Sequence, residues 1–266
     1  MFSAAFHTSR HYMLFTAMAS LCVLLGGPSC AAGADSLFVA GSTYYEPGVS
    51  GPGWAWTDAD HLELTGYAGE AIGADGDLVV TLVGQNSVVE THAADADISM
   101  SGMEVWGNLT LCGSGSLMAT GSQCGIHVSQ ALVVDRCTVE ARADGAGVVN
   151  QTVAGIFADG LTVRGGGRVV AAGTGSDAGL SFYGVRLLDE GFGADIANET
   201  LVVDASWLDA TGADAGVVCE HGSLVAARFV APAGGTFGAG GVVDAGGTVA
   251  TRVVIEPLGA TAPAGE

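Results

Sequence analysis

Apolar and polar residues alternate in short runs along most of the chain, beginning near Leu62. The runs are separated by clusters of Gly, Asp, Asn and Ser, and no long segment shows the helical period of about 3.6 residues. Alternation of this kind is typical of strands joined by turns. The pattern therefore predicts an all-β fold.

The predicted strands recur in a fixed order, and each unit begins with a glycine followed by an apolar pair. Units begin at Gly125, Gly155, Gly179 and Gly216, and each carries short apolar runs with turns between them. A group of strands that cannot bury its own apolar face must stack on the next group. We therefore expect a right-handed parallel β-helix, a solenoid with a continuous core, rather than a sandwich or barrel, neither of which would require a repeat.

The first 60 residues of the chain have a different residue pattern. Arg10 and His11 precede an apolar run at residues 13–25, and small residues precede Asp35, which is the pattern of a signal peptide. The aromatic and turn-forming residues that follow do not repeat and predict a cap. The expected organisation is a signal peptide at 1–34, an N-terminal cap at 35–60, β-helix repeats at 61–256 and a flexible tail at 257–266.

The signal peptide determines where we expect the protein to be found. Its apolar run is 13 residues long, which is short for a membrane span. We expect export to the extracellular space or cell surface, with no membrane insertion after signal cleavage. Cys30 leaves lipid anchoring as an alternative.

The charge balance excludes several function classes. The chain has 28 acidic and 8 basic residues, a formal net charge of −20, and every basic residue is Arg. Without Lys there is no Schiff-base catalysis and no P-loop lysine. A strongly negative protein repels phosphate backbones, so we expect no nucleic-acid partner.

One long stretch resembles a known group of proteins. It contains Gly-Trp-Ala-Trp at 53–56 and Ala-Ile-Gly-Ala-Asp-Gly-Asp-Leu-Val-Val-Thr-Leu-Val at 71–83, and Gly-Ile-x-Ala and Leu-Thr-Val units follow. Over residues 53–254 the chain resembles exported, glycine-rich β-helix repeat proteins of Gram-positive gut bacteria, often labelled cell-surface or carbohydrate-binding. The resemblance implies an exported β-helix and brings no catalytic motif.

Four cysteines follow the signal peptide, and an even number in an exported protein suggests disulfides. Cys112 and Cys137 follow comparable strands in successive units, so a disulfide between them is one prediction. Burial as small apolar side chains is the alternative. Zinc binding by Cys219 and His221 is a third, weakened by the absence of any Cys-x-x-Cys pair.

Two further groups of residues are candidates for a binding site. Asp95 and Asp97 place two carboxylates on one face of a strand or in one loop, an arrangement that can hold Ca²⁺; solvated turn residues are the alternative. We expect no other cofactor. Aromatic side chains near the cap can stack on sugar rings or can cover the exposed end of the core; they are Tyr44, Tyr45, Trp54 and Trp56.

These observations together predict an exported, non-enzymatic module for binding or adhesion, with an extracellular glycan or another host or bacterial surface ligand as partner. A polysaccharide lyase or glycoside hydrolase on a β-helix scaffold is one alternative, and a purely structural surface stalk is another. An enzyme would gather acids with an Arg or His from several coils in one groove, whereas a rod would scatter its acids over turns. An open last coil would also permit head-to-tail self-association.

Overall fold

The computed structural model describes residues 33–91, 100–148, 151–177, 179–189 and 199–260, which belong to one unit, Ala32–Glu266. All regular elements in these ranges are strands, so the all-β prediction is confirmed. None of these residues forms a helix long and apolar enough to cross a membrane. Nearly all of the predicted signal peptide, Cys30, Asp95 and Asp97, and the last part of the predicted tail lie outside the described residues.

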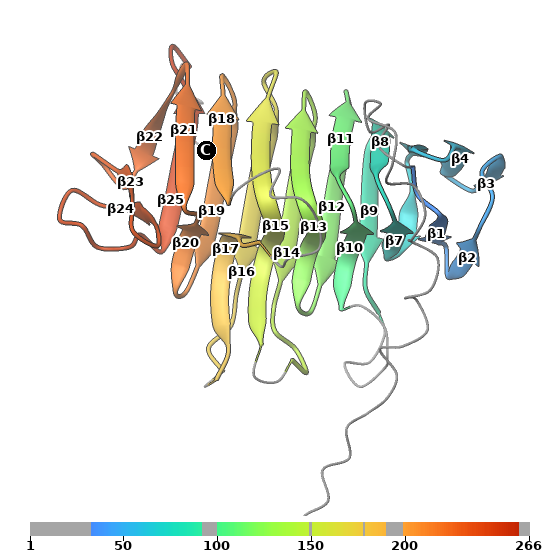
Figure 1. Cartoon of the computed structure of the whole chain (residues 1–266), viewed down its shortest axis with the longest axis horizontal. Coiled ribbons are helices and arrows are strands. Elements are labelled where there is room, and N and C mark those ends of the chain that lie inside the picture. Colours follow the sequence, from blue (N-terminus) through green and yellow to red (C-terminus); the bar gives the residue numbers. More distant parts are fainter. Residues whose placement is uncertain (1–32, 92–99, 149–150, 178, 190–198, 261–266) are drawn as a thin grey trace, which may run out of the picture. The chain divides into compact units, whose positions relative to one another are not determined.

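Most strands form three stacks, in which each strand pairs with its equivalent in the next part of the chain (Figure 1). Pairing in the first stack is parallel throughout. Its members are β7 (Ile72–Asp75), β10 (Ser101–Trp106), the first half of β13 (Cys124–Asp135), the first half of β15 (Thr152–Arg164), β17 (Ser181–Leu187) and β20 (Ala215–Val218).

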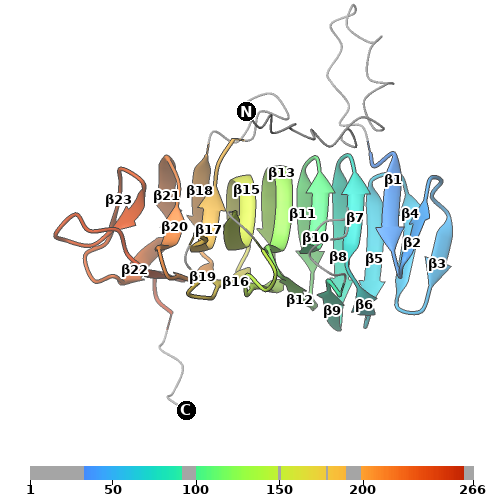
Figure 2. The same ribbon diagram turned by 90° about the horizontal axis from the view of Figure 1, so that it is seen from below.

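The second stack is also parallel, and Figure 2 shows several of its strands side by side. The strands β13 and β15 are long enough to run through both stacks. The other members are β5 (His61–Thr65), β8 (Leu78–Val83), β11 (Leu109–Gly113), β18 (Thr200–Asp204) and β21 (His221–Val225).

The third stack forms a separate sheet, parallel from β6 to β19 and antiparallel beyond β19. Its members, in spatial order, are β6 (Ala68–Glu70), β9 (Gln85–Val89), β12 (Ser116–Gly121), β14 (Thr138–Ala143), β16 (Arg168–Gly173), β19 (Trp207–Gly212), β25 (Arg252–Pro257) and β22 (Ala227–Ala231).

The alternating sequence pattern places the same kind of side chain in line on successive strands. Leu109, Leu132, Leu161 and Leu201 pair in register across four strands of the second stack, and all four are buried. Because successive residues of a strand face opposite sides, the residues just before and just after each of these leucines face outward. The core is thus a set of aliphatic columns between the stacks.

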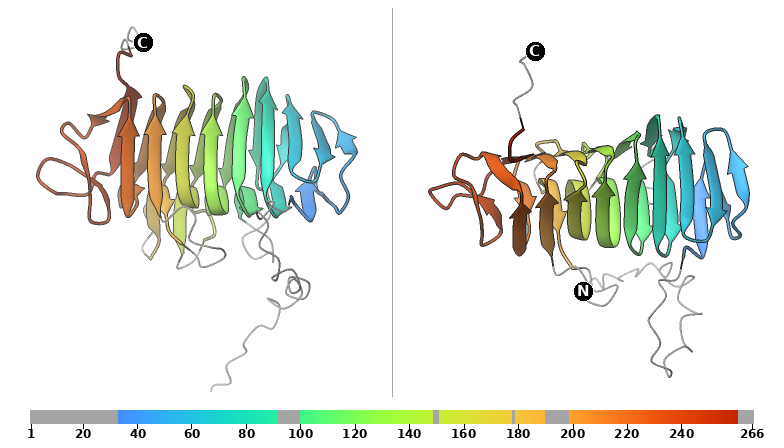
Figure 3. Two further views of the ribbon diagram at one scale, coloured as in Figure 1. Left: turned by 45° about the horizontal axis from the view of Figure 1, so that its top comes forward. Right: turned by 90° about the horizontal axis from the view of Figure 1, so that it is seen from above.

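Antiparallel hairpins lie at both ends of the stacks (Figure 3). The change from antiparallel to parallel pairing at the N-terminal end falls at β7 in the first stack, which pairs with β1 and β10, and at β5 in the second stack, which pairs with β4 and β8. Because the sheets are mixed, the finer prediction of a right-handed parallel β-helix stays a prediction. The end strands are β1 (Ser36–Val39), β2 (Ser42–Tyr44), β3 (Val49–Gly51), β4 (Trp54–Asp58), β23 (Thr236–Gly238) and β24 (Gly241–Val243).

A column of glycines marks the line where the first and third stacks meet. A Cβ on Gly125 would lie 2.4 Å from the backbone nitrogen of Arg142, and one on Gly155 would lie 2.4 Å from that of Ala172. No side chain fits at such distances. The column consists of Gly102, Gly125, Gly155, Gly184 and Gly216.

One unit boundary was predicted wrongly from the sequence. Ile156 pairs with Val185, so the glycine equivalent to Gly155 is Gly184 and not Gly179. The spacing of 24 residues from Gly155 to Gly179 does not reflect the strand register, whereas Gly184 follows Gly155 by 29 residues, close to the 30 that separate Gly125 from Gly155.

Candidate functional site

The outer face of the first stack carries a row of chemically distinct side chains. Met103 and Val105 point into the core, so Glu104 between them points outward. His127, Phe157 and Arg186 occupy the same register position on the next three strands. We call Glu104, His127, Phe157 and Arg186 the outer row. With a spacing of about 4.8 Å between strands, it spans about 14 Å.

The members of the outer row contact one another in sequence. The Nδ1 atom of His127 lies 3.0 Å from Oε1 of Glu104, and both side chains are largely buried. The imidazole meets the Phe157 ring edge to face, with centroids 5.4 Å apart. The guanidinium of Arg186 lies 5.6 Å from the centroid of the Phe157 ring. Contacts of these kinds favour fixed orientations over free rotation.

Two aromatic side chains extend the outer row on either side. The indole of Trp106, two residues after Glu104 on β10, packs against His127 with centroids 5.5 Å apart, and 42% of Trp106 is exposed. Tyr183 lies beneath the guanidinium of Arg186 at 5.2 Å, and Arg186 also donates a hydrogen bond to Thr152 Oγ1. The result is a carboxylate, an imidazole and a guanidinium set among aromatic rings.

The outer row has clear limits on both sides. The residue in register with Glu104 on β7 is Gly73, and the residue in register with Arg186 on β20 is Val218. Neither has a polar side chain. The concentration of functional groups is therefore local to four consecutive strands.

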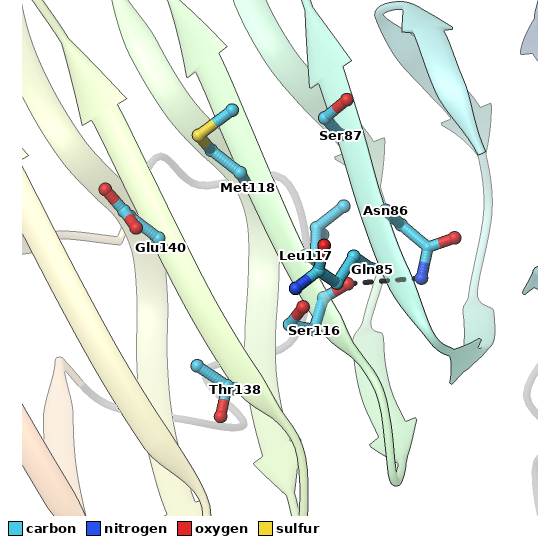
Figure 4. A pocket seen from close by; sticks show the side chains of 8 residues that line it. All are labelled: Gln85, Asn86, Ser87, Ser116, Leu117, Met118, Thr138 and Glu140. Atoms are coloured by element: carbon cyan, nitrogen blue, oxygen red, sulfur yellow. Dashed lines mark hydrogen bonds between the residues drawn. The ribbon is translucent and has the colours of Figure 1, made fainter. Parts of the chain in front are cut away.

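A second candidate surface is a groove on the outer face of the third stack, with a volume of about 490 Å³ (Figure 4). Asn86 lines it but is committed to the fold, because it donates to the carbonyls of Val83 and Ser116 and accepts from the Tyr67 amide. The groove contains no aromatic ring. Its lining residues are Gln85, Asn86, Ser87, Ser116, Leu117, Met118, Thr138 and Glu140.

The aromatic residues predicted as ligand-binding near the cap are placed differently from one another. Trp54 and Trp56 are 5% and 0% exposed, so neither presents a ring face to solvent, and both contribute to the core. Tyr44 packs on Trp54 with centroids 5.4 Å apart. Only Tyr45 is strongly exposed. Covering the end of the core is the role that their burial supports.

The candidate disulfide partners are both free thiols in the structure. Cys137 is buried and donates a hydrogen bond to the carbonyl of Leu111, 3.3 Å away. Burial, together with the nearby Cys112 thiol, raises the pKa of Cys137 to about 12. A thiol with so high a pKa is a poor nucleophile at neutral pH, so these contacts fit the packing alternative.

The predicted Ca²⁺ ligands Asp95 and Asp97 lie outside the described residues. Elsewhere in the described part of the chain, no three His, Cys, Asp or Glu side chains come together to form a metal site. The outer row was not predicted from the sequence. The only available signal was its repeat position, two residues after the column glycine, as in Gly125-Ile126-His127.

No protein-family model, no curated protein and no solved structure matches this chain.

Proposed function

We propose that this protein is an exported, non-enzymatic binding module at the cell surface, that its ligand is a carbohydrate, and that the outer row is its binding face. The observation that carries the proposal is the exposed indole of Trp106 beside the hydrogen-bonding groups of Glu104, His127 and Arg186, which lie in line across the buried ring of Phe157. Sugars have apolar ring faces and many hydroxyls, so they are bound by stacking and by polar side chains together. Trp106 offers the exposed ring, and Glu104, His127 and Arg186 offer the polar groups.

The scaffold that we infer for this module is a right-handed parallel β-helix with antiparallel hairpins at both ends. Three stacks of parallel strands, each pairing with its equivalent in the next part of the chain, support this inference. Crossover connections between parallel strands are almost always right-handed. The signal-peptide pattern at residues 1–34 and the resemblance to exported β-helix proteins support the proposed location.

A glycan-array screen tests the proposal directly, with Ca²⁺ and with a chelator in parallel. Trp106→Ala should weaken binding about tenfold, since an exposed aromatic in a binding face commonly contributes that much. Met118→Ala is the matched control, because Met118 is also 42% exposed but lies in the groove of the third stack. Equal losses for the two variants, or no loss for Trp106→Ala, would contradict the assignment of the site.

The Glu104–His127 pair favours a second candidate function, a polysaccharide lyase or glycoside hydrolase. A carboxylate 3.0 Å from an imidazole is an arrangement used in general acid–base catalysis. Release of reducing or unsaturated ends from any bound glycan would establish turnover. In that case Glu104→Gln should abolish turnover while leaving binding within about threefold. Binding without turnover supports the non-enzymatic module, and absence of both supports a structural stalk.

A further inference from the structure

The last strand of the second stack has an open edge. β21 pairs with β18 on one side only. The amide of His221 donates to the carbonyl of Glu199, and the carbonyl of Val225 accepts from the amide of Ala205. Because backbone groups alternate in direction along a strand, Gly222 and Leu224 point their N–H and C=O groups to the other side. Those groups have no partner among the described residues.

Exposed apolar side chains lie beside this edge. Val225 ends β21 and is 49% exposed. Leu258 is also exposed and is close in space, since its amide donates to the carbonyl of Ala226 at 2.8 Å. An unpaired strand next to apolar side chains is a template for pairing with another chain.

The charge distribution indicates which chain can approach. Residues 215–260 carry three acids and two arginines, and those arginines are paired with Glu256 and Asp209. The N-terminal end is far more negative: residues 33–70 hold no Lys or Arg and six acids, Asp35, Glu46, Asp58, Asp60, Glu63 and Glu70. In a chain of net charge −20, two copies repel each other least where their C-terminal ends meet.

We propose that the open edge of β21 binds a second copy of this chain, tail to tail. β21 of each copy pairs antiparallel with β21 of the other around a two-fold axis, so the same groups are satisfied on both sides. This arrangement differs from head-to-tail association, which would place the six N-terminal acids against the partner and offer it strands of only three residues, such as β2 and β3. The dimer would present two outer rows and bind a polymeric ligand bivalently, a consequence that rests on the proposed function.

Sedimentation equilibrium or light scattering on the purified full chain tests the dimer without reference to any ligand. We expect a monomer–dimer equilibrium that shifts toward dimer as salt screens the net charge. Val225→Lys should raise the dissociation constant at least tenfold, because it places a charge at the pairing edge. Val83→Lys is the control: Val83 is 41% exposed on β8, far along the stack, and its variant should dimerise like wild type.

Hydrogen exchange gives a second measurement that does not depend on a variant folding. The amides of Gly222 and Leu224 should be protected in concentrated samples and should lose that protection on dilution. A wild-type chain that stays monomeric at all concentrations and salts would overturn the proposal. So would dimerisation that Val225→Lys and Val83→Lys weaken equally, or concentration-dependent protection confined to β2 and β3.

Discussion

The two ends of the strand stacks differ in the length of their edge strands and in the aromatic side chains that cover the core. At the N-terminal end the edge strands β2, β3 and β6 have three residues each, and buried Trp56 fills the core behind them. At the C-terminal end the edge strands β21 and β22 have five residues each, and the half-buried rings of Phe229 and Phe237 cover the core. Short edge strands in an acidic region discourage pairing, whereas longer strands in a less charged region permit it. We therefore expect the two ends to differ in stability and in their ability to pair with another chain.

Truncating the aromatic side chains at the two ends should give the largest contrast in stability. Trp56→Ala should lower the free energy of unfolding by about 4 kcal/mol, because it removes a fully buried indole. Phe237→Ala should cost about 1–2 kcal/mol, because that ring is only partly buried. Urea denaturation followed by tryptophan fluorescence and circular dichroism measures both. Equal losses would mean that the C-terminal end is packed as tightly as the N-terminal end.

The glycine column provides a comparison between the middle of the stacks and the N-terminal end. Gly155→Ala should cost about 2–3 kcal/mol, because the new Cβ would lie 2.4 Å from the backbone nitrogen of Ala172. Gly73→Ala at the N-terminal end should change stability by less than about 0.5 kcal/mol, since the nearest atom to its Cβ would be 3.6 Å away. Thermal unfolding of both variants tests the pair. A Gly155→Ala protein as stable as wild type would refute the close approach of the two sheets.

Alkaline pH should weaken the C-terminal half before the N-terminal cap. Burial, with a smaller effect of Glu199, raises the pKa of Cys219 from 9.0 to about 11. The folded state therefore keeps the proton that the unfolded state releases above pH 9, so stability is fully present below pH 9 and is lost as pH rises toward 11. The loss should be about 1–2 kcal/mol.

Denaturation midpoints between pH 8 and pH 11 measure this effect. Cys219→Ala should flatten the dependence on pH, although Cys137, whose pKa is also raised, will leave a residual slope above pH 9. An unchanged slope in the Cys219→Ala variant would show that Cys219 is not responsible.

The smallest expected effect concerns the ion pair between β22 and β25. Arg228→Ala removes the contact with Glu256, whose Oε1 lies 3.1 Å from Nε of Arg228, but the arginine side chain is 57% exposed. Exposed pairs contribute about 0.5 kcal/mol or less, and salt screens them. Denaturation in low and high salt should show a difference that vanishes at high salt. A loss above about 1 kcal/mol would mean that the C-terminal end depends on this pair.

The fold class was predictable because each strand carries its own signal. Alternating runs such as Leu132 to Val134 predict strands, and the glycines at 125 and 155 correctly mark equivalent positions. The unit start at Gly184 was not predicted, because Gly179, a glycine followed by Leu180, also resembles the start of a unit. Register, rather than spacing, decides which glycine belongs to the column.

The candidate site could not be found in the sequence for a related reason. Glu104, His127, Phe157 and Arg186 are four different residue types at one repeat position, so no motif contains them. Their proximity exists only after the strands are paired. Conversely, the aromatic cluster of Trp54 and Trp56 was visible in the sequence, but alternation alone does not tell which face of a strand is buried.

The glycine column also bears on how this protein can evolve. Every missense change of a glycine introduces a side chain, so no substitution at Gly102, Gly125, Gly155, Gly184 or Gly216 avoids the close backbone contacts of the column. Two residues further on, the outward positions tolerate Glu, His, Phe, Arg and Val on the same scaffold. Each unit thus holds a fixed glycine and, two residues later, a variable outward side chain, so selection can change the outer row without changing the architecture.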